Sequence, residues 1–200
     1  STVYGQTETS PVLTQTFPDD SEEDICNTVG QPLPNKDIAI LDPKTSKIMP
    51  LNTIGEICSR GYCNMLRYND NPEATKATID ESGWLHTGDL GSMDERGYVK
   101  ITGRLKEMII RGGENLFPAE IENTLLEHPA VAEVAVVGIP DPKWGEIVGC
   151  FIRPVDDKPE IPDLIAHCRQ YLSPVKTPTK WMFVEEWPLT GSGKIQKFNL

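Results

Sequence analysis

The sequence lacks the features that mark disulfide-stapled, zinc-binding and membrane-spanning proteins. It has five cysteines in 200 residues, an odd number without a C-x-x-C pair, and three histidines that lie far apart. This pattern disfavours a zinc site and predicts reduced thiols in a reducing compartment. No apolar run approaches the roughly 20 residues that a membrane-spanning helix needs. We therefore expect no transmembrane segment.

Positive charge is also scarce. The chain has 30 Asp and Glu residues against 19 Lys and Arg residues, which gives a formal net charge of −11. An acidic surface disfavours non-specific binding to nucleic acids and to anionic membranes, so we expect no nucleic-acid partner. The 38% of hydrophobic residues can form real cores, in one domain or in two modest ones.

A P-loop is absent as well, although one stretch resembles it. Residues 188–198 read PLTGSGKIQKF, with Lys194 directly after a glycine. A P-loop needs a glycine where this chain has Pro188, and Ser or Thr where it has Ile195. A phosphate-binding role for Lys194 therefore has to be argued from other features.

The first half of the chain alternates turn residues with short apolar segments. The acidic run at 19–24 lies in a polar stretch, residues 11–37, and predicts a solvated loop. The first ten residues show neither a helix nor a strand pattern. Strands are predicted at 37–42 and 55–61, a helix at 71–79, and short strands with glycine turns at 83–104, as in a β-meander or small barrel.

A mixed β/α pattern begins near residue 106. Helices are predicted at 118–129 and 161–172, and strands at 131–139, 146–155 and 180–187, after a short strand with a double-glycine turn. Cys168 shares a helical face with apolar residues, so we interpret it as a core residue. We expect two domains, residues 1–105 and 106–200, the second with the size of a small domain.

The stretch YGQTE at 4–8 could bind a nucleotide. Tyr4 offers a face for a flat ring, and Thr7 can donate to a phosphate oxygen. Glu8 could hold Mg²⁺, which prefers one or two carboxylates plus phosphate oxygens. Taken alone, the stretch fits an ordinary turn at least as well.

Two further stretches allow similar chemistry. Asp89, in HTGD, could present both oxygens to a vicinal diol such as ribose, or could cap a turn. Arg104 could form a bidentate contact with a ribose or phosphate. Gly112 and Gly113 remove side chains where a ligand could pass, or simply form a tight turn.

The order of these motifs is more informative than any one of them. Six motifs follow one another along the chain: YGQTE, GEICSRGY, WLHTGD, GRLKEMIIRGGENLFPAEIE, VVGIPDPKWGE and PLTGSGKIQKF. This series resembles the adenylate-forming superfamily, and within it the acyl-CoA synthetases; two of the motifs lean toward the fatty-acid–CoA ligases. The resemblance implies an α+β fold, with a β-rich, distorted-barrel subdomain that closes a large N-terminal domain. A small mixed α/β domain follows it.

The resemblance also assigns roles at the nucleotide. Tyr4 would stack on adenine, Thr7 would contact the α-phosphate region, and Glu8 would coordinate Mg²⁺. Asp89 would bind the ribose hydroxyls, with Arg104 beside them. ATP, Mg²⁺ and coenzyme A are the implied cofactors and co-substrates.

A second set of implied roles concerns the C-terminal domain. Lys194 would be the adenylation lysine, and Lys106 the hinge about which this domain rotates between the two half-reactions. Gly113, with Gly112, would line the pantetheine tunnel. Ile110 is a departure, because some relatives carry a lysine there that helps the second step.

We therefore expect the chain to be the C-terminal portion of an AMP-forming fatty-acid–CoA ligase. The family's Ser/Thr/Gly-rich phosphate loop and acyl pocket belong to a preceding portion, so these 200 residues should be inactive alone. The alternatives are a non-catalytic nucleotide- or pantetheine-binding or interaction module, and an adenylation domain that loads a carrier protein. The expected compartment is the cytoplasm, or an organelle if a preceding segment carries a targeting signal. The sequence allows a homodimer without indicating one.

Overall fold

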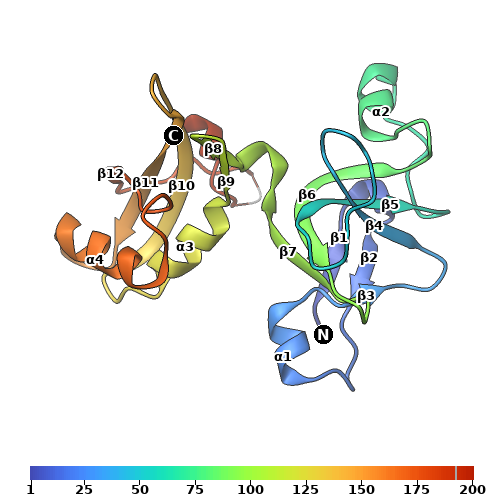
Figure 1. The fold of residues 1–200 in the computed structure, drawn as a ribbon, viewed down its shortest axis with the longest axis horizontal. Coiled ribbons are helices and arrows are strands. Elements are labelled where there is room, and N and C mark those ends of the chain that lie inside the picture. Colours follow the sequence, from blue (N-terminus) through green and yellow to red (C-terminus); the bar gives the residue numbers. More distant parts are fainter. Residues whose placement is uncertain (192) are drawn as a thin grey trace. The chain divides into compact units, whose positions relative to one another are not determined.

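The computed structural model describes residues 1–191 and 193–200. The chain divides into two compact units, Ser1–Leu105 and Lys106–Leu200, which we describe separately (Figure 1). Both units combine sheets with short helices, which confirms the α+β class. Among the described residues, no helix has the length and apolar character needed to cross a membrane.

The first unit begins with a small antiparallel sheet. It consists of β1 (Val3–Gly5), β2 (Val12–Gln15) and β3 (Gln31–Pro32), in that order. The expectation of no strand in the first ten residues is wrong. β1 is only three residues long, which is too short to show an alternation of apolar and polar residues. Its pairing with β2 is what defines it as a strand.

A four-stranded antiparallel sheet forms the rest of this unit. Its strands follow chain order: β4 (Asp37–Leu41), β5 (Gly55–Arg60), β6 (Leu85–Met93) and β7 (Val99–Arg104). In the described part of the chain, these two sheets stay open and do not close into a barrel. One core cluster takes buried side chains from both sheets, among them Tyr4, Leu13, Ile40, Ile57 and Val99.

One helix of this unit, α2 (Pro72–Thr78), begins where its sequence predicts. In α2, the Asn71 side chain accepts a hydrogen bond from the Ala74 N–H at 3.0 Å, and proline occupies the first helical position. Both features are local, because a cap satisfies an N–H that the first turn leaves without an intrahelical acceptor. The helix therefore required no tertiary information to be predicted.

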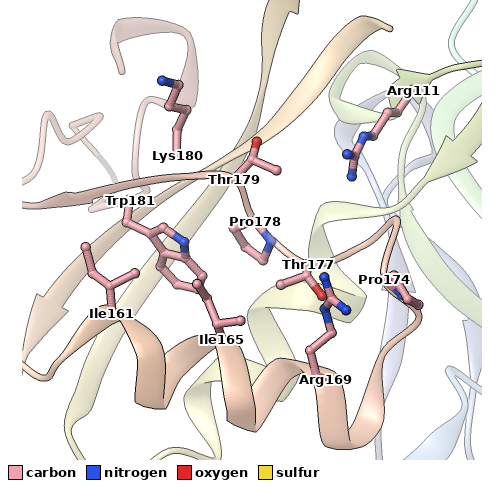
Figure 2. Close-up of a pocket in the computed structure, with 10 residues that line it drawn as sticks. All are labelled: Arg111, Ile161, Ile165, Arg169, Pro174, Thr177, Pro178, Thr179, Lys180 and Trp181. Carbon is pink, nitrogen blue, oxygen red and sulfur yellow. The ribbon is translucent and has the colours of Figure 1, made fainter.

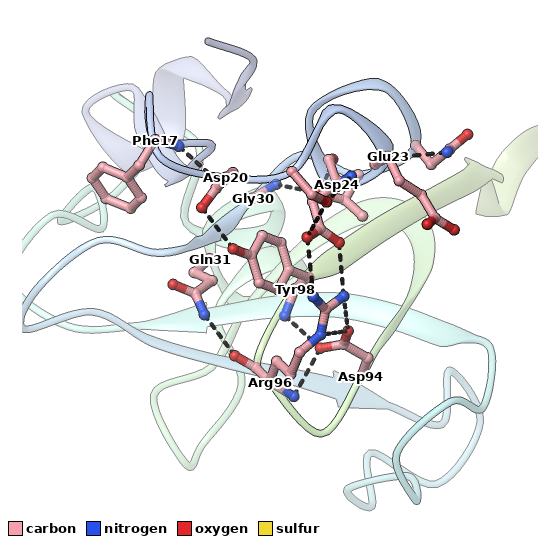
Figure 3. Close-up of polar contacts among 12 residues, drawn as sticks. Phe17, Asp20, Glu23, Asp24, Gly30, Gln31, Asp94, Arg96 and Tyr98 are labelled. Carbon is pink, nitrogen blue, oxygen red and sulfur yellow. Dashed lines mark hydrogen bonds and ion pairs between the residues drawn. The ribbon is translucent and has the colours of Figure 1, made fainter.

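The acidic run is more ordered than its composition suggests. Its last three residues begin α1 (Glu22–Asn27), and the Ser21 hydroxyl caps this helix by accepting from the Asp24 N–H at 3.1 Å. The Asp24 carboxylate is nearly buried and accepts two hydrogen bonds from Arg96, at 2.7 and 3.0 Å (Figure 3). The prediction of a loop is therefore wrong for residues 22–24, and the prediction of a solvated side chain is wrong for Asp24, whose partner Arg96 lies 72 residues away along the chain.

Replacement of Arg96 should make this unit less stable in a pH-dependent way. The Arg96 guanidinium, together with the Ser21 hydroxyl, holds the pKa of Asp24 below its ordinary value of 3.8. The Asp24 contribution is therefore present above that value and is lost as the pH falls through the lower folded pKa. We expect Arg96→Met to lower the urea midpoint at pH 7, with a difference that shrinks below pH 3.8.

Urea unfolding at a series of pH values measures this difference. The matched control is Arg67→Met, which changes an exposed arginine of the same unit. A deficit of equal size at every pH would contradict the role of the Asp24–Arg96 pair, and so would an equal deficit in the control.

The second unit is built on a five-stranded sheet. Its strands are β8 (Ile109–Arg111), β9 (Glu114–Leu116), β10 (Val131–Asp141), β11 (Gly145–Pro154) and β12 (Lys180–Phe183). β10 and β11 form a long antiparallel hairpin, and β12 joins β11 in parallel. The buried strands predicted from their apolar runs are confirmed.

Two helices complete the core of the second unit. α3 (Pro118–Leu126) buries Ile121 and Leu125, and α4 (Ile161–Tyr171) buries Leu164 and Cys168, as their spacing predicts. Burial raises the pKa of the Cys168 thiol to about 11. Cys168 is therefore a neutral core residue, and the sequence-based interpretation is confirmed.

Candidate functional site

In the first unit, three of the predicted site residues lie together. The Tyr4 hydroxyl on β1 donates to Asp89 Oδ2 at 3.0 Å, and Arg104 Nε lies 3.2 Å from Asp89 Oδ1. Asp89 and Arg104 are cross-strand partners on β6 and β7. Asp89 is 9% exposed and needs such partners, because burying an unpaired charge is costly. Arg104 is mostly exposed and can move toward a ligand.

The β5–β6 pairing is irregular next to Asp89. Cys58 pairs with His86 and Glu56 with Leu90, so that Ile57 alone faces the three β6 residues 87–89. Such a bulge re-aims side chains and is common beside functional sites. At its centre lies Gly88, with a φ of +76° that favours glycine.

At the candidate site, Tyr4 acts through its hydroxyl more than through its ring. The residue is only 8% exposed and belongs to a core cluster of the first unit. Burial raises the pKa of Tyr4 far above its usual range, and the Asp89 carboxylate adds to this effect. The hydroxyl is therefore a neutral donor, and stacking of the ring on adenine stays a prediction.

Glu8 and Thr7 lie on the 3-10 turn η1 (Thr7–Thr9). The half-buried Glu8 accepts a hydrogen bond at Oε1 from the Tyr68 hydroxyl at 2.8 Å. Thr7 is exposed. The sequence motif did not reveal Tyr68, which lies 60 residues from Glu8 along the chain. Glu8 is a fixed carboxylate of the kind that can coordinate Mg²⁺.

Lys194 lies on an exposed hairpin-like loop of the second unit. Leu189 and Ile195 form an isolated β-bridge, and the Thr190 N–H donates to the Lys194 carbonyl at 2.8 Å. The Lys194 N–H donates in turn to the Thr190 hydroxyl at 3.0 Å. This pairing fixes the backbone at Lys194, whose side chain is exposed.

The segment after Lys194 is anchored by a lysine that sequence reasoning missed. Lys197 Nζ lies 2.7 Å from Glu107 Oε2 and 2.8 Å from Glu122 Oε1. Burial by itself would lower the pKa of Lys197, but Glu122 and Glu107 raise it above its usual range. The tail is thereby tied to α3 and to η2 (Leu105–Glu107), the turn that contains the exposed Lys106.

Gly112 and Gly113 form the turn between β8 and β9. Their φ angles are +59° and +89°, which side chains disfavour. A Cβ at Gly112 would approach the Trp144 ring to 3.0 Å, whereas a Cβ at Gly113 would meet nothing within 4 Å. The turn and Trp144 explain Gly112, and the space beside Gly113 could admit a ligand.

A cavity of about 540 Å³ lies between α4 and β12 (Figure 2). It combines an apolar surface with cationic side chains, and its lining residues are Arg111, Ile161, Ile165, Arg169, Pro174, Thr177, Pro178, Thr179, Lys180 and Trp181. The Trp181 Nε1–H is buried and has no acceptor among the described residues. A smaller cavity of about 360 Å³ shares Arg111 and Arg169 and reaches Gly112 and Trp144. Together they suit a ligand that carries several negative charges.

Two protein-family models match this sequence. The model described as AMP-binding enzyme matches residues 1–69, and AMP-binding enzyme C-terminal domain matches residues 120–194. The chain belongs to the AMP-binding enzyme family. The first match contains Tyr4, Thr7 and Glu8, and the second ends at Lys194.

The curated relatives that match this chain carry the names of acyl-CoA synthetases and ligases. YngI of Bacillus subtilis (strain 168), which its name provisionally assigns to the acyl-CoA synthetases, is 48% identical over 98% of the chain and 36% of its own length. The human mitochondrial medium-chain acyl-CoA ligase ACSF2 is 44% identical over 98% of the chain and 32% of its length. The chain thus spans about a third of these curated relatives.

A solved structure shares the fold. It is the o-succinylbenzoate CoA synthetase MenE of Bacillus subtilis, in complex with its acyl-adenylate intermediate, OSB-AMP. It is 33% identical to this chain, with a TM-score of 0.90, and the match covers 98% of this chain and 40% of MenE.

Proposed function

We propose that this chain is the C-terminal portion of an AMP-forming acid–CoA ligase. The ligase joins the carboxylate of a medium- or long-chain fatty acid to the α-phosphorus of ATP, with release of pyrophosphate, to form an acyl-adenylate. It then transfers the acyl group to the thiol of coenzyme A, with release of AMP. The observation that carries the proposal is the Asp89 carboxylate, held by Tyr4 and Arg104, in a chain that also presents Lys194 on an exposed loop. The family membership and the relatives' names support it.

In this proposal, the first unit holds the nucleotide. Asp89 accepts hydrogen bonds from the ribose hydroxyls, and the exposed Arg104 moves aside to contact the ribose or a phosphate. Thr7 donates to the α-phosphate region. Glu8, fixed by Tyr68, would hold the Mg²⁺ that accompanies ATP, and this ion would supply positive charge beside the phosphates.

Lys194 promotes adenylation. Attack of a carboxylate on the α-phosphorus brings two anions together and builds negative charge on the phosphoryl oxygens. An ammonium group at this point stabilises the transition state more than the ground state. Gly191 and Gly193, which both precede Lys194, bring no bulky side chain to the loop, and a Cβ at either position would meet nothing within 4 Å.

Thioester formation uses the second unit. We assign the phosphates of coenzyme A to the cationic side chains of the two cavities, Arg111, Arg169 and Lys180. The pantetheine arm passes the open space beside Gly113. Lys194 has to leave before a thiol can reach the acyl carbonyl, so we assign Lys106 as the hinge of a domain rotation.

The proposal is tested by ATP–pyrophosphate exchange in the full-length protein that carries this chain. With Mg²⁺ and acids from acetate to palmitate, we expect exchange that depends on the acid and is strongest for medium or long chains. Addition of coenzyme A should then yield the acyl-CoA. No exchange with any acid would favour a non-catalytic module, and exchange without acyl-CoA would favour a carrier-protein acceptor. We expect the 200 residues alone to be inactive.

A further inference from the structure

A buried carboxylate next to the candidate site has no role in the proposed chemistry. Glu56 on β5 is 4% exposed. Its Oε1 accepts a hydrogen bond from the Gly88 N–H at 2.9 Å, and its Oε2 lies 2.7 Å from His86 Nδ1. Both partners belong to β6, in the segment that leads to Asp89. A carboxylate is buried at such a place only where its hydrogen bonds compensate for lost water.

His86 holds this carboxylate from one side. His86 Nδ1 lies at hydrogen-bond distance from Glu56 Oε2. On the other side of the ring, Nε2 lies 3.5 Å from Asp80 Oδ2, and this contact limits rotation of the imidazole. The Glu56 side chain is thus held at both of its carboxylate oxygens, Oε1 by Gly88 and Oε2 by His86.

The same atoms could be considered as a metal site. Glu56, Cys58 and His86 bring three ligand atoms within 4.8 Å of one another. The 2.7 Å separation of His86 Nδ1 and Glu56 Oε2 is a hydrogen-bond distance, so these two atoms satisfy each other. Burial and the neighbouring Glu56 carboxylate raise the pKa of the Cys58 thiol far above its usual range, so it stays neutral. The cluster is therefore a hydrogen-bonding network.

This network compensates for the bulge in β6. Ile57 faces three residues, so the β5 ladder cannot supply a backbone acceptor for each N–H of residues 87–89. Glu56 accepts from Gly88, and the Thr87 hydroxyl accepts from the Asp89 N–H at 3.1 Å. Thr87 in turn donates to the Ile57 carbonyl at 2.7 Å. Two side chains thus replace the missing backbone partners.

We propose that Glu56, held by His86, is the positioning residue that places Asp89 for nucleotide binding. Glu56 fixes the backbone of Gly88, and that backbone carries the next residue, Asp89, toward Tyr4 and Arg104. The inference rests on the proposed function, because it assumes that Asp89 binds ribose hydroxyls. A group that acts through Asp89 has to affect the recognition of those hydroxyls.

The test compares ATP with 2′,3′-dideoxy-ATP in pyrophosphate exchange by the full-length protein. The variants are Glu56→Met, Glu56→Gln, Asp89→Ala and the double variant Glu56→Met/Asp89→Ala. We expect Glu56→Met to lower kcat/KM for ATP by on the order of 10²-fold, since a misplacement of about 1 Å can have that effect. The dideoxy substrate should lose much less, so the preference for ATP collapses as in Asp89→Ala.

The other variants separate positioning from general damage. Glu56→Gln keeps an acceptor for Gly88 and should retain most of the preference for ATP. The double variant should show the same preference for ATP as Asp89→Ala, because the effects of replacing two groups that act through one contact do not add. If Glu56→Met does not yield folded protein, Thr87→Val tests the same bulge and should weaken the preference.

Two outcomes would overturn the inference without touching the proposed function. One is an equal loss for both nucleotides in Glu56→Met, and the other is an additive loss in the double variant. If Asp89→Ala itself leaves the preference unchanged, the ribose role assigned to Asp89 fails together with the inference. Absence of exchange in the unmodified protein would instead overturn the ligase proposal.

Discussion

Lys194→Ala should lower the rate of acyl-adenylate formation by about 10²–10³-fold, the effect usual for loss of one group that stabilises transition-state charge. Thioester formation from a supplied acyl-adenylate should be almost unchanged. The physical reason is that phosphoryl charge develops only in the first half-reaction. Lys194 is exposed, and backbone pairing with Thr190 fixes its loop, so this variant should keep its fold. A folding defect would therefore not explain such a loss.

The two half-reactions can be measured separately. Pyrophosphate exchange reports adenylation, and conversion of synthetic acyl-adenylate with coenzyme A reports thioester formation. Lys158→Ala is the matched control, because Lys158 is an exposed lysine of the same unit in the segment between β11 and α4. Equal losses in both half-reactions would remove the adenylation role from Lys194.

The second large effect is expected at the hinge. Lys106→Pro fixes φ near −65° and removes a backbone N–H, which restricts a residue that has to change its torsions during domain rotation. Lys106 is exposed in η2, where the first compact unit gives way to the second. We expect thioester formation to fall by on the order of 10²-fold, with a much smaller effect on adenylation.

Single-turnover measurements of each half-reaction test this expectation. Lys106→Ala removes the same side chain while leaving the backbone unrestricted, so it should affect thioester formation far less than Lys106→Pro does. A larger loss in adenylation than in thioester formation would show that Lys106 is not the hinge. Similar behaviour of the two variants would assign the effect to the ammonium group.

Much of the secondary structure could be predicted because its signals are local. Asn71 and Pro72 mark the start of α2, and the spacing of Ile121 and Leu125 gives the buried face of α3. The long apolar run at 131–139 gives β10. In each case, the residues that define the element lie within a few turns or strand positions of one another.

Other features could not be predicted because they depend on register and on distant partners. The acidic run reads as a solvated loop until Arg96 is placed against Asp24. The β6 bulge depends on the register in which β5 and β6 pair. The alternation of apolar and polar residues along either strand does not predict a register shift. Lys197 is an unremarkable tail lysine until Glu107 and Glu122 are brought to it.

The sequence by itself determined the family, through six motifs in a fixed order, and with it the residues to examine, from Tyr4 to Lys194. Tertiary structure alone decided what those residues contact. It paired the buried Asp89 with Tyr4 and Arg104. It also placed the Glu56 carboxylate against His86 and Gly88, at the bulge that contains Asp89. The reason is physical: a motif fixes the type of side chain, whereas its partners, burial and pKa are set by strands that pair across the sheet.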